Sequence, residues 1–91
     1  MICRAAASIN DVSIMKVCKQ FGGTLRLARE EKNWSQEVLA DRAGLNRSYL
    51  GEIERGSAMP SLATVAKLAD ALGINLSVLI ARCEHSLAII E

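Results

Sequence analysis

The sequence predicts a small all-α domain of five helices, and three observations support this fold class. The chain has 91 residues, which suits one domain rather than two. It is 51% hydrophobic but only 3% aromatic, a composition typical of closely packed helices rich in alanine and leucine. Apolar residues recur three and four positions apart, as on one face of a helix, whereas the alternation typical of strands is weak.

The first helix is predicted over Val17–Lys32. Phe21, Leu25 and Ala28 lie on one of its faces at helical spacing. A pair of glycines in its first half weakens the prediction there. Asn33 suits a left-handed end to the helix, because asparagine is the commonest residue after glycine in that conformation.

Two short helices follow, joined by a very short turn. Ser35 is an N-cap for a helix over Gln36–Ala43, which ends at Gly44. Asn46 caps the next helix, which is expected to run to Arg55. The residues expected to face inward are Leu39, Ala40 and Ala43 on the first of these helices, and Leu50 and Ile53 on the second.

Two more helices are predicted after Pro60. Ser61 caps the fourth helix and Gly73 closes it, while Asn75 caps the fifth. The apolar residues of the fourth helix form a stripe at helical spacing, and those of the fifth cover more than one face. These residues are Leu62, Val65, Leu68, Ala69 and Leu72 in the fourth helix, and Leu76, Val78, Leu79 and Ile80 in the fifth.

The five helices divide the chain into a domain and two terminal segments. We expect residues 17–82 to form the domain, residues 1–16 an N-terminal arm or extension, and residues 83–91 a C-terminal tail. The fifth helix and the tail are a candidate dimerisation element, because their surplus apolar residues would otherwise form an exposed patch. The apolar residues of the tail include Leu87, Ile89 and Ile90.

The composition also limits the classes of function. The net charge is +1, so binding to nucleic acid must depend on where the charges lie and not on the overall charge. No apolar run is long enough to cross a membrane. Asparagine and aspartate interrupt the first apolar stretch, which makes it a poor signal peptide. The expected location is the cytoplasm, in association with the nucleoid.

The three cysteines do not form a disulfide framework, because their number is odd and their spacing irregular. One alternative function rests on them: a small metal or redox protein that uses Cys18, Cys83 and His85. A structural zinc site needs four ligands at close spacings, which this sequence lacks. We therefore expect no metal and no cofactor.

The second and third helices together predict a helix-turn-helix, in which two short helices are joined by a tight turn. Ala40 provides a small residue where the helices cross, and Gly44 suits a turn with positive φ. Leu50 and Ile53, three positions apart, can face back toward the second helix. Gly51 is unexpected inside a helix, where glycine costs about 1 kcal/mol relative to alanine.

The chain from Phe21 to Ala81 resembles the lambda-repressor/Cro-like helix-turn-helix regulators, also called the xenobiotic-response-element family. The stretch SQEVLADRAGL resembles the second helix and turn of that family, YLGEIERG the end of its third helix, and MPSLATVAKLADALGI its fourth. The stretch NRSYLGEIERG is especially similar to the controller proteins of restriction–modification systems. The resemblance implies a compact five-helix, lambda-repressor-like DNA-binding domain.

The resemblance also implies that the third helix enters the major groove of DNA. An arginine there can donate two hydrogen bonds to guanine, a serine can bond either type of base, and a glutamate can accept from cytosine or repel phosphates. The residues expected to contact bases are Asn46, Arg47, Ser48 and Glu52.

A second set of residues is expected on the DNA backbone. Gln36 begins the second helix, where free N–H groups favour a phosphate. The resemblance adds Ser35 and Arg55 to this set, and Tyr49 is expected to pack while its hydroxyl reaches a phosphate. The resemblance further implies an ion pair between Arg29 and Glu54, which would fix the angle of the third helix.

These features predict a sequence-specific, double-stranded DNA-binding transcriptional regulator of the repressor or controller type. The expected partners are a palindromic DNA operator and a second copy of the chain. No paired carboxylates or phosphate loop indicate an enzyme, and no small-molecule ligand is expected. The alternative function is a protein-interaction or antitoxin-type helix-turn-helix module, whose main partner is another protein.

Overall fold

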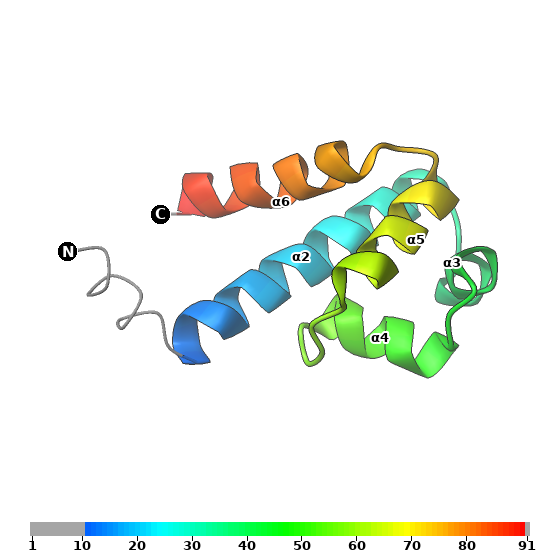
Figure 1. The fold of residues 1–91 in the computed structure, drawn as a ribbon, viewed down its shortest axis with the longest axis horizontal. Helices are drawn as coiled ribbons and strands as arrows, with labels where there is room; N and C mark the ends of the chain where they lie inside the picture. Colours follow the sequence, from blue (N-terminus) through cyan, green and yellow to red (C-terminus); the bar gives the residue numbers. More distant parts are fainter. Residues whose placement is uncertain (1–10, 91) are drawn as a thin grey trace.

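The computed structural model describes the backbone of residues 11–90 and the side chains of residues 15–84. The described part of the chain is all-α, as predicted, and contains no strand. A long helix, α2, packs against α4 and α6, while α3 packs against α4 and α5 (Figure 1). The helices are α2 (Asp11–Glu31), α3 (Gln36–Ala43), α4 (Arg47–Arg55), α5 (Leu62–Leu72) and α6 (Leu76–Ile90).

The first helix is longer than the sequence predicts. It begins at Asp11 rather than at Val17, so residues 11–16 of the expected N-terminal arm are helical, and residues 1–10 lie outside the described part. The pair of glycines does not interrupt the helix, because packing against neighbouring helices outweighs local propensity. Asn33 has a φ of 60°, so the predicted left-handed end is confirmed.

The predicted serine caps of α3 and α5 are present. The side-chain oxygen of Ser35 accepts from the backbone N–H of Val38 at 3.2 Å, and that of Ser61 accepts from Thr64 at 3.1 Å. The helix α6 begins directly after Asn75, whose backbone carbonyl accepts from residues 78 and 79. The helices α3, α4 and α5 each end at a glycine with positive φ, as their sequences predict.

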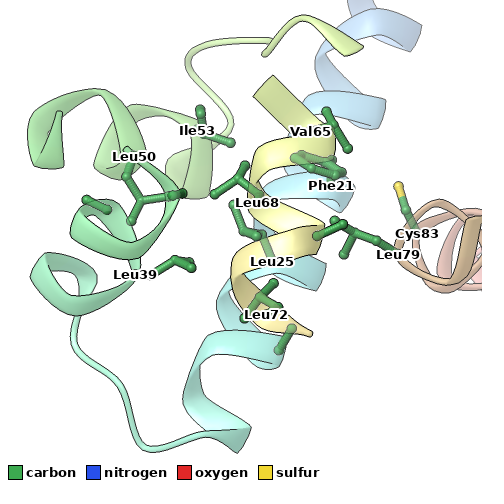
Figure 2. Close-up of a cluster of buried hydrophobic side chains, with 14 residues drawn as sticks. Phe21, Leu25, Leu39, Leu50, Ile53, Val65, Leu68, Leu72, Leu79 and Cys83 are labelled. Carbon is green, nitrogen blue, oxygen red and sulfur yellow. The ribbon is translucent and has the colours of Figure 1, made fainter. Parts of the chain in front are cut away.

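The hydrophobic core lies where α2, α3, α4 and α5 meet, and α6 closes one side of it (Figure 2). One predicted core residue is misplaced: Leu62 is 68% exposed. It is the first residue of α5, and the buried stripe of that helix begins one turn later at Val65. The largest fully buried side chains are Leu25, Leu39, Leu50, Ile53, Leu68, Leu72 and Leu79.

The predicted C-terminal tail is not separate from the domain. The helix α6 continues to Ile90, and Cys83 is buried in the core. Cys83 follows the fully buried Leu79 by one helical turn, so the same face of α6 continues into the tail. The side chains of Leu87, Ile89 and Ile90 lie outside those that the structure describes.

The described cysteines are buried thiols. The Sγ atom of Cys18 lies 3.5 Å from the Sδ atom of Met59. Burial, with a smaller contribution from the charge of Glu84, raises the pKa of the Cys83 thiol, which disfavours the thiolate that a metal needs. Among the described residues no three histidine, cysteine or acidic side chains lie close enough to hold a metal, and the side chain of His85 lies outside this set.

No single helix within residues 11–90 is both long and apolar enough to span a membrane. The helix α5 and the first part of α6 meet the length and composition criteria only as a pair, and that pair is bent by 104°.

Candidate nucleic-acid interface

The helices α3 and α4 form the predicted helix-turn-helix, and α4 has two sharply different faces. The buried face carries Leu50, Gly51, Ile53 and Glu54. The predicted turn residue Gly44 has a φ of 69°, and its N–H bonds to the last turn of α3. The exposed face is polar and carries Arg47, Ser48, Glu52 and Arg55. The turn therefore presents α4 with a polar face directed away from the core, as a recognition helix requires.

The ion pair implied for Arg29 and Glu54 is present and almost buried. The Nε and Nη2 atoms of Arg29 donate to the two carboxylate oxygens of Glu54 at 2.8 and 3.0 Å. The side chains are only 11% and 3% exposed, respectively. The Nη1 atom of Arg29 also donates to the backbone carbonyl of Trp34 at 2.7 Å. The pair therefore joins α2 and the loop before α3 to the buried face of α4.

The hydrogen bond from Arg29 to Glu54 raises the pKa of the guanidinium, and burial opposes this only in part. Arg29 therefore stays charged at every pH at which the protein would be studied. Its positive charge neutralises the buried carboxylate, which would otherwise be costly to hold away from water.

Gln36 has a role that the sequence does not indicate. Its Nε2 atom donates to the Oε1 atom of Glu54 at 2.9 Å, so part of its amide is engaged within the protein. Gln36 is half-buried, and it begins α3 as predicted. Its contact to a phosphate remains a prediction, and it would use the amide atoms that Glu54 does not occupy.

Asn46 is also engaged within the protein. Its Oδ1 atom accepts from the backbone N–H of Ser48 at 2.7 Å and of Tyr49 at 3.3 Å, so it caps α4. Only its Nδ2 atom is then available to a base. Tyr49 is half-buried against the core, which agrees with the packing expected of it.

Three residues expected at the bases are open to a ligand. The side chains of Arg47, Ser48 and Glu52 are exposed. In the described part of the chain they make no hydrogen bond or ion pair with another residue. They can therefore reach a base without breaking an internal contact.

The glycine inside α4 is buried beside side chains from both helices of the helix-turn-helix. A Cβ atom on Gly51 would lie 3.3 Å from the Nη1 atom of Arg55 and 3.7 Å from the Oε1 atom of Gln36. A Cβ atom would therefore crowd only the flexible end of Arg55, by a few tenths of an ångström, and would be in ordinary contact with Gln36. The sequence shows only the loss of helix propensity at this position, because the nearby Gln36 is distant along the chain.

The sole tryptophan marks one side of the helix-turn-helix. Trp34 lies between α2 and α3 and is partly buried against the core. The guanidinium of Arg42 lies 4.5 Å from the centre of its ring, and the ammonium of Lys32 lies 5.5 Å away. Two cationic side chains therefore lie against the ring of Trp34, so the ring does not offer an open surface for stacking.

Comparisons with known proteins agree with this geometry. Residues 25–79, from α2 to α6, match the family described as helix-turn-helix, HTH_3. The immunity repressor protein of Bacillus phage phi105 is 42% identical over 59 residues, which are 65% of this chain and 41% of the repressor. The control protein C.SmaI of Serratia marcescens is 35% identical over 72 residues, which are 79% of this chain and 86% of that protein.

A solved structure is similar in both sequence and fold. The restriction–modification controller protein C.AhdI from Aeromonas hydrophila superposes with a TM-score of 0.67 and 47% sequence identity, over 68% of this chain and 94% of that protein. The chain thus corresponds to nearly the whole of this controller protein, but to only 41% of the length of the phage repressor.

Proposed function

This chain belongs to the helix-turn-helix family HTH_3, and from this premise we propose that it binds double-stranded DNA at specific sequences and thereby regulates transcription. The resemblance to lambda-repressor/Cro-like regulators and the fold implied by it are confirmed. The observation that carries the proposal is the exposed polar face of α4, whose opposite face is fixed by the buried Arg29–Glu54 pair. A rigid support is what a recognition helix needs for reproducible base contacts.

In the proposed complex α4 lies in the major groove. One set of residues recognises the base sequence, and another set positions the domain on the DNA backbone. Arg47 would donate to guanine, with Ser48, Glu52 and the amide of Asn46 at neighbouring base edges. Contacts to phosphates would position the domain without reading the sequence. The residues proposed for those contacts are Ser35, Gln36, Tyr49 and Arg55.

The alternative of a protein-interaction or antitoxin-type module has less support. The exposed face of α4 is polar and charged, whereas a face that docks a protein is expected to be rich in apolar and aromatic residues at its centre. The relatives named above are a repressor and control proteins. We propose no enzymatic activity, no cofactor and no small-molecule ligand for this domain. We also propose that it acts at the nucleoid in the cytoplasm, where its DNA partner would be.

Arg47→Ala should weaken binding to the specific site by roughly 1–3 kcal/mol and relax the preference at one base pair. The site is first obtained by selecting bound sequences from a random DNA pool. Gel-shift titrations of the variant against the selected site and a scrambled site then measure both effects. Arg82→Ala on α6 is the matched control and should leave both affinities unchanged. Equal losses on the two DNAs would show that Arg47 contacts only phosphate.

We also propose that the protein acts as a two-fold symmetric dimer. One recognition helix covers only a few base pairs, and helix-turn-helix dimers place two such helices on half-sites about 34 Å apart. The helix α6 faces the core through Leu79 and Cys83, yet Val78 and Ile80 on its other sides are 38% and 41% exposed. These two apolar side chains are available to a second copy of α6.

Ile80→Asp should convert the dimer to a monomer at micromolar concentration without unfolding it, because the side chain is not part of the core. Sedimentation equilibrium measures the mass, and circular dichroism checks the fold. Leu62→Asp is the control, since it adds the same charge at an exposed leucine on α5. A wild-type chain that stays monomeric even on a palindromic site would contradict the dimer.

A further inference from the structure

A surface cavity of about 250 Å³ lies between α2, α3 and α4, beside the buried ion pair. Three arginines, one glutamine and one glutamate line it. Two of its residues, Gln36 and Arg55, are among those proposed for phosphate contacts. The lining also includes Arg26 on α2, which is not among the residues proposed to contact DNA. The complete lining is Arg26, Arg29, Gln36, Glu54 and Arg55.

The cavity carries a net positive charge. Its only carboxylate, Glu54, is 3% exposed, and its two oxygens accept three hydrogen bonds, two from Arg29 and one from Gln36. The charge of Glu54 is therefore balanced by Arg29 and directed inward. The guanidinium groups of Arg26 and Arg55 remain, and both residues are exposed. An anion entering the cavity would meet these two groups and not the carboxylate.

Each of the two exposed arginines can turn toward an anion at small cost. The side chain of Arg55 makes no hydrogen bond or ion pair within the described residues, and its Nη1 atom lies over Gly51. Arg26 pairs with Glu30 at 3.0 Å, but the two side chains are 63% and 47% exposed. Exposed pairs of this kind contribute about 0–1 kcal/mol, so a bound phosphate can compete with Glu30.

We propose that this cavity binds a phosphate of the DNA backbone. The guanidinium groups of Arg26 on α2 and Arg55 on α4 would contact the phosphate. The proposal rests on the DNA binding proposed above and extends the backbone contact beyond the helix-turn-helix. Gln36, the first residue of α3, lines the cavity together with the two arginines, and the helix start favours an anion there. The Nη1 atom of Arg55 lies close to Gly51, where there is no Cβ atom to crowd it.

The salt dependence of DNA binding tests this role of Arg26. Each neutralised phosphate adds about 0.9 to the slope of log affinity against log salt concentration. Arg26→Ala should therefore lower the slope by about 0.9, equally on specific and scrambled DNA. Arg26→Lys keeps the charge and should retain most of the slope. Glu30→Gln removes the competing carboxylate and should tighten binding.

Arg82→Ala is the matched control, because Arg82 also forms an exposed ion pair with a glutamate of α2, Glu31, at 3.6 Å. Its slope should equal that of the wild type. A wild-type slope for Arg26→Ala would overturn the phosphate site while leaving the proposed function intact. A wild-type protein that binds neither DNA would instead remove the proposed function, and the site with it. Urea melts check that each variant is folded.

A second experiment distinguishes binding of a DNA phosphate from binding of free phosphate. The free protein is titrated with inorganic phosphate at millimolar concentration, and the Nε–H resonance of Arg26 is followed by NMR. No saturable shift is expected, because the proposal assigns the phosphate to the DNA that α3 and α4 position. A saturable shift combined with an unchanged salt slope for Arg26→Ala would assign the cavity to a free anion and overturn the proposal.

Discussion

Gly22→Ala should destabilise the protein by roughly 1–3 kcal/mol, although alanine is the better helix former. A Cβ atom at this position would lie 2.4 Å from the backbone oxygen of Ile53 and 2.5 Å from that of Glu54. Both oxygens belong to the last turn of α4 and cannot rotate away as a flexible side chain could. The two helices would have to separate, and α4 would lose its position on α2.

The neighbouring glycine provides the control. Gly23 lies in the same helix, but a Cβ atom there would meet nothing within 4 Å. Gly23→Ala should therefore stabilise the protein by roughly 0.5–1 kcal/mol. In a domain of this size, 1 kcal/mol shifts the melting temperature by about 4–8 °C, so thermal melts resolve the two opposite signs. A gain for both variants would show that α2 and α4 are not in close contact at Gly22.

The features of the fold that depend on local chemistry could be predicted from the sequence. Ser35 and Ser61 cap helices because a side-chain oxygen reaches N–H groups two or three residues ahead. Gly44 and Asn33 allow left-handed ends because of their own conformational preferences. The buried stripes followed from helical spacing. Each of these predictions requires only residues that are close along the chain.

The features that depend on distant partners could not be predicted in this way. The two glycines of α2 look alike as weak points in a helix, yet only Gly22 packs against the backbone of α4. Leu62 fits the spacing of the α5 stripe, but the core does not extend to the first turn of that helix. The spacing of apolar residues likewise does not show that α2 begins at Asp11, before the predicted start at Val17.

The same distinction between local features and contacts with distant residues applies to the candidate site. The pairing of Arg29 with Glu54, 25 positions apart, was available only through the family resemblance. The bond from Gln36 to the same carboxylate was missed, because the position of Gln36 at a helix start indicates only an anion. The base contacts of Arg47, Ser48 and Glu52 remain predictions that rest on the exposed face of α4.

Arg29→Ala should be the most destabilising of the substitutions considered for this protein. It leaves the carboxylate of Glu54, which is 3% exposed, with Gln36 as its remaining hydrogen-bond donor. Removing one partner of a buried ion pair costs about 3–5 kcal/mol, because the other charge stays buried and uncompensated. Glu54→Ala should have a similar effect, since it leaves a guanidinium that is 11% exposed with only the carbonyl of Trp34.

The double variant separates the energy of the pair from the energy of burying each charge alone. With both side chains removed, neither charge is left without its partner, so the total loss should be smaller than the sum of the two single losses. The difference is the coupling energy, which is about 0.5–3 kcal/mol for residues in contact. Urea melts of the wild type, the two single variants and the double variant give all four stabilities. Additive losses would mean that the two side chains do not interact.

The charge state of Arg29 fixes the pH at which this cycle should be measured. Its pKa is raised in the folded protein, chiefly by the hydrogen bond to Glu54. A raised pKa contributes stability that is complete below the pKa of the unfolded chain and is lost only as the pH rises through the folded value. For arginine both values lie far above neutrality, so the contribution of its charge should be constant between about pH 6 and pH 9. A coupling energy that falls within that range would mean that a group other than Arg29 neutralises Glu54.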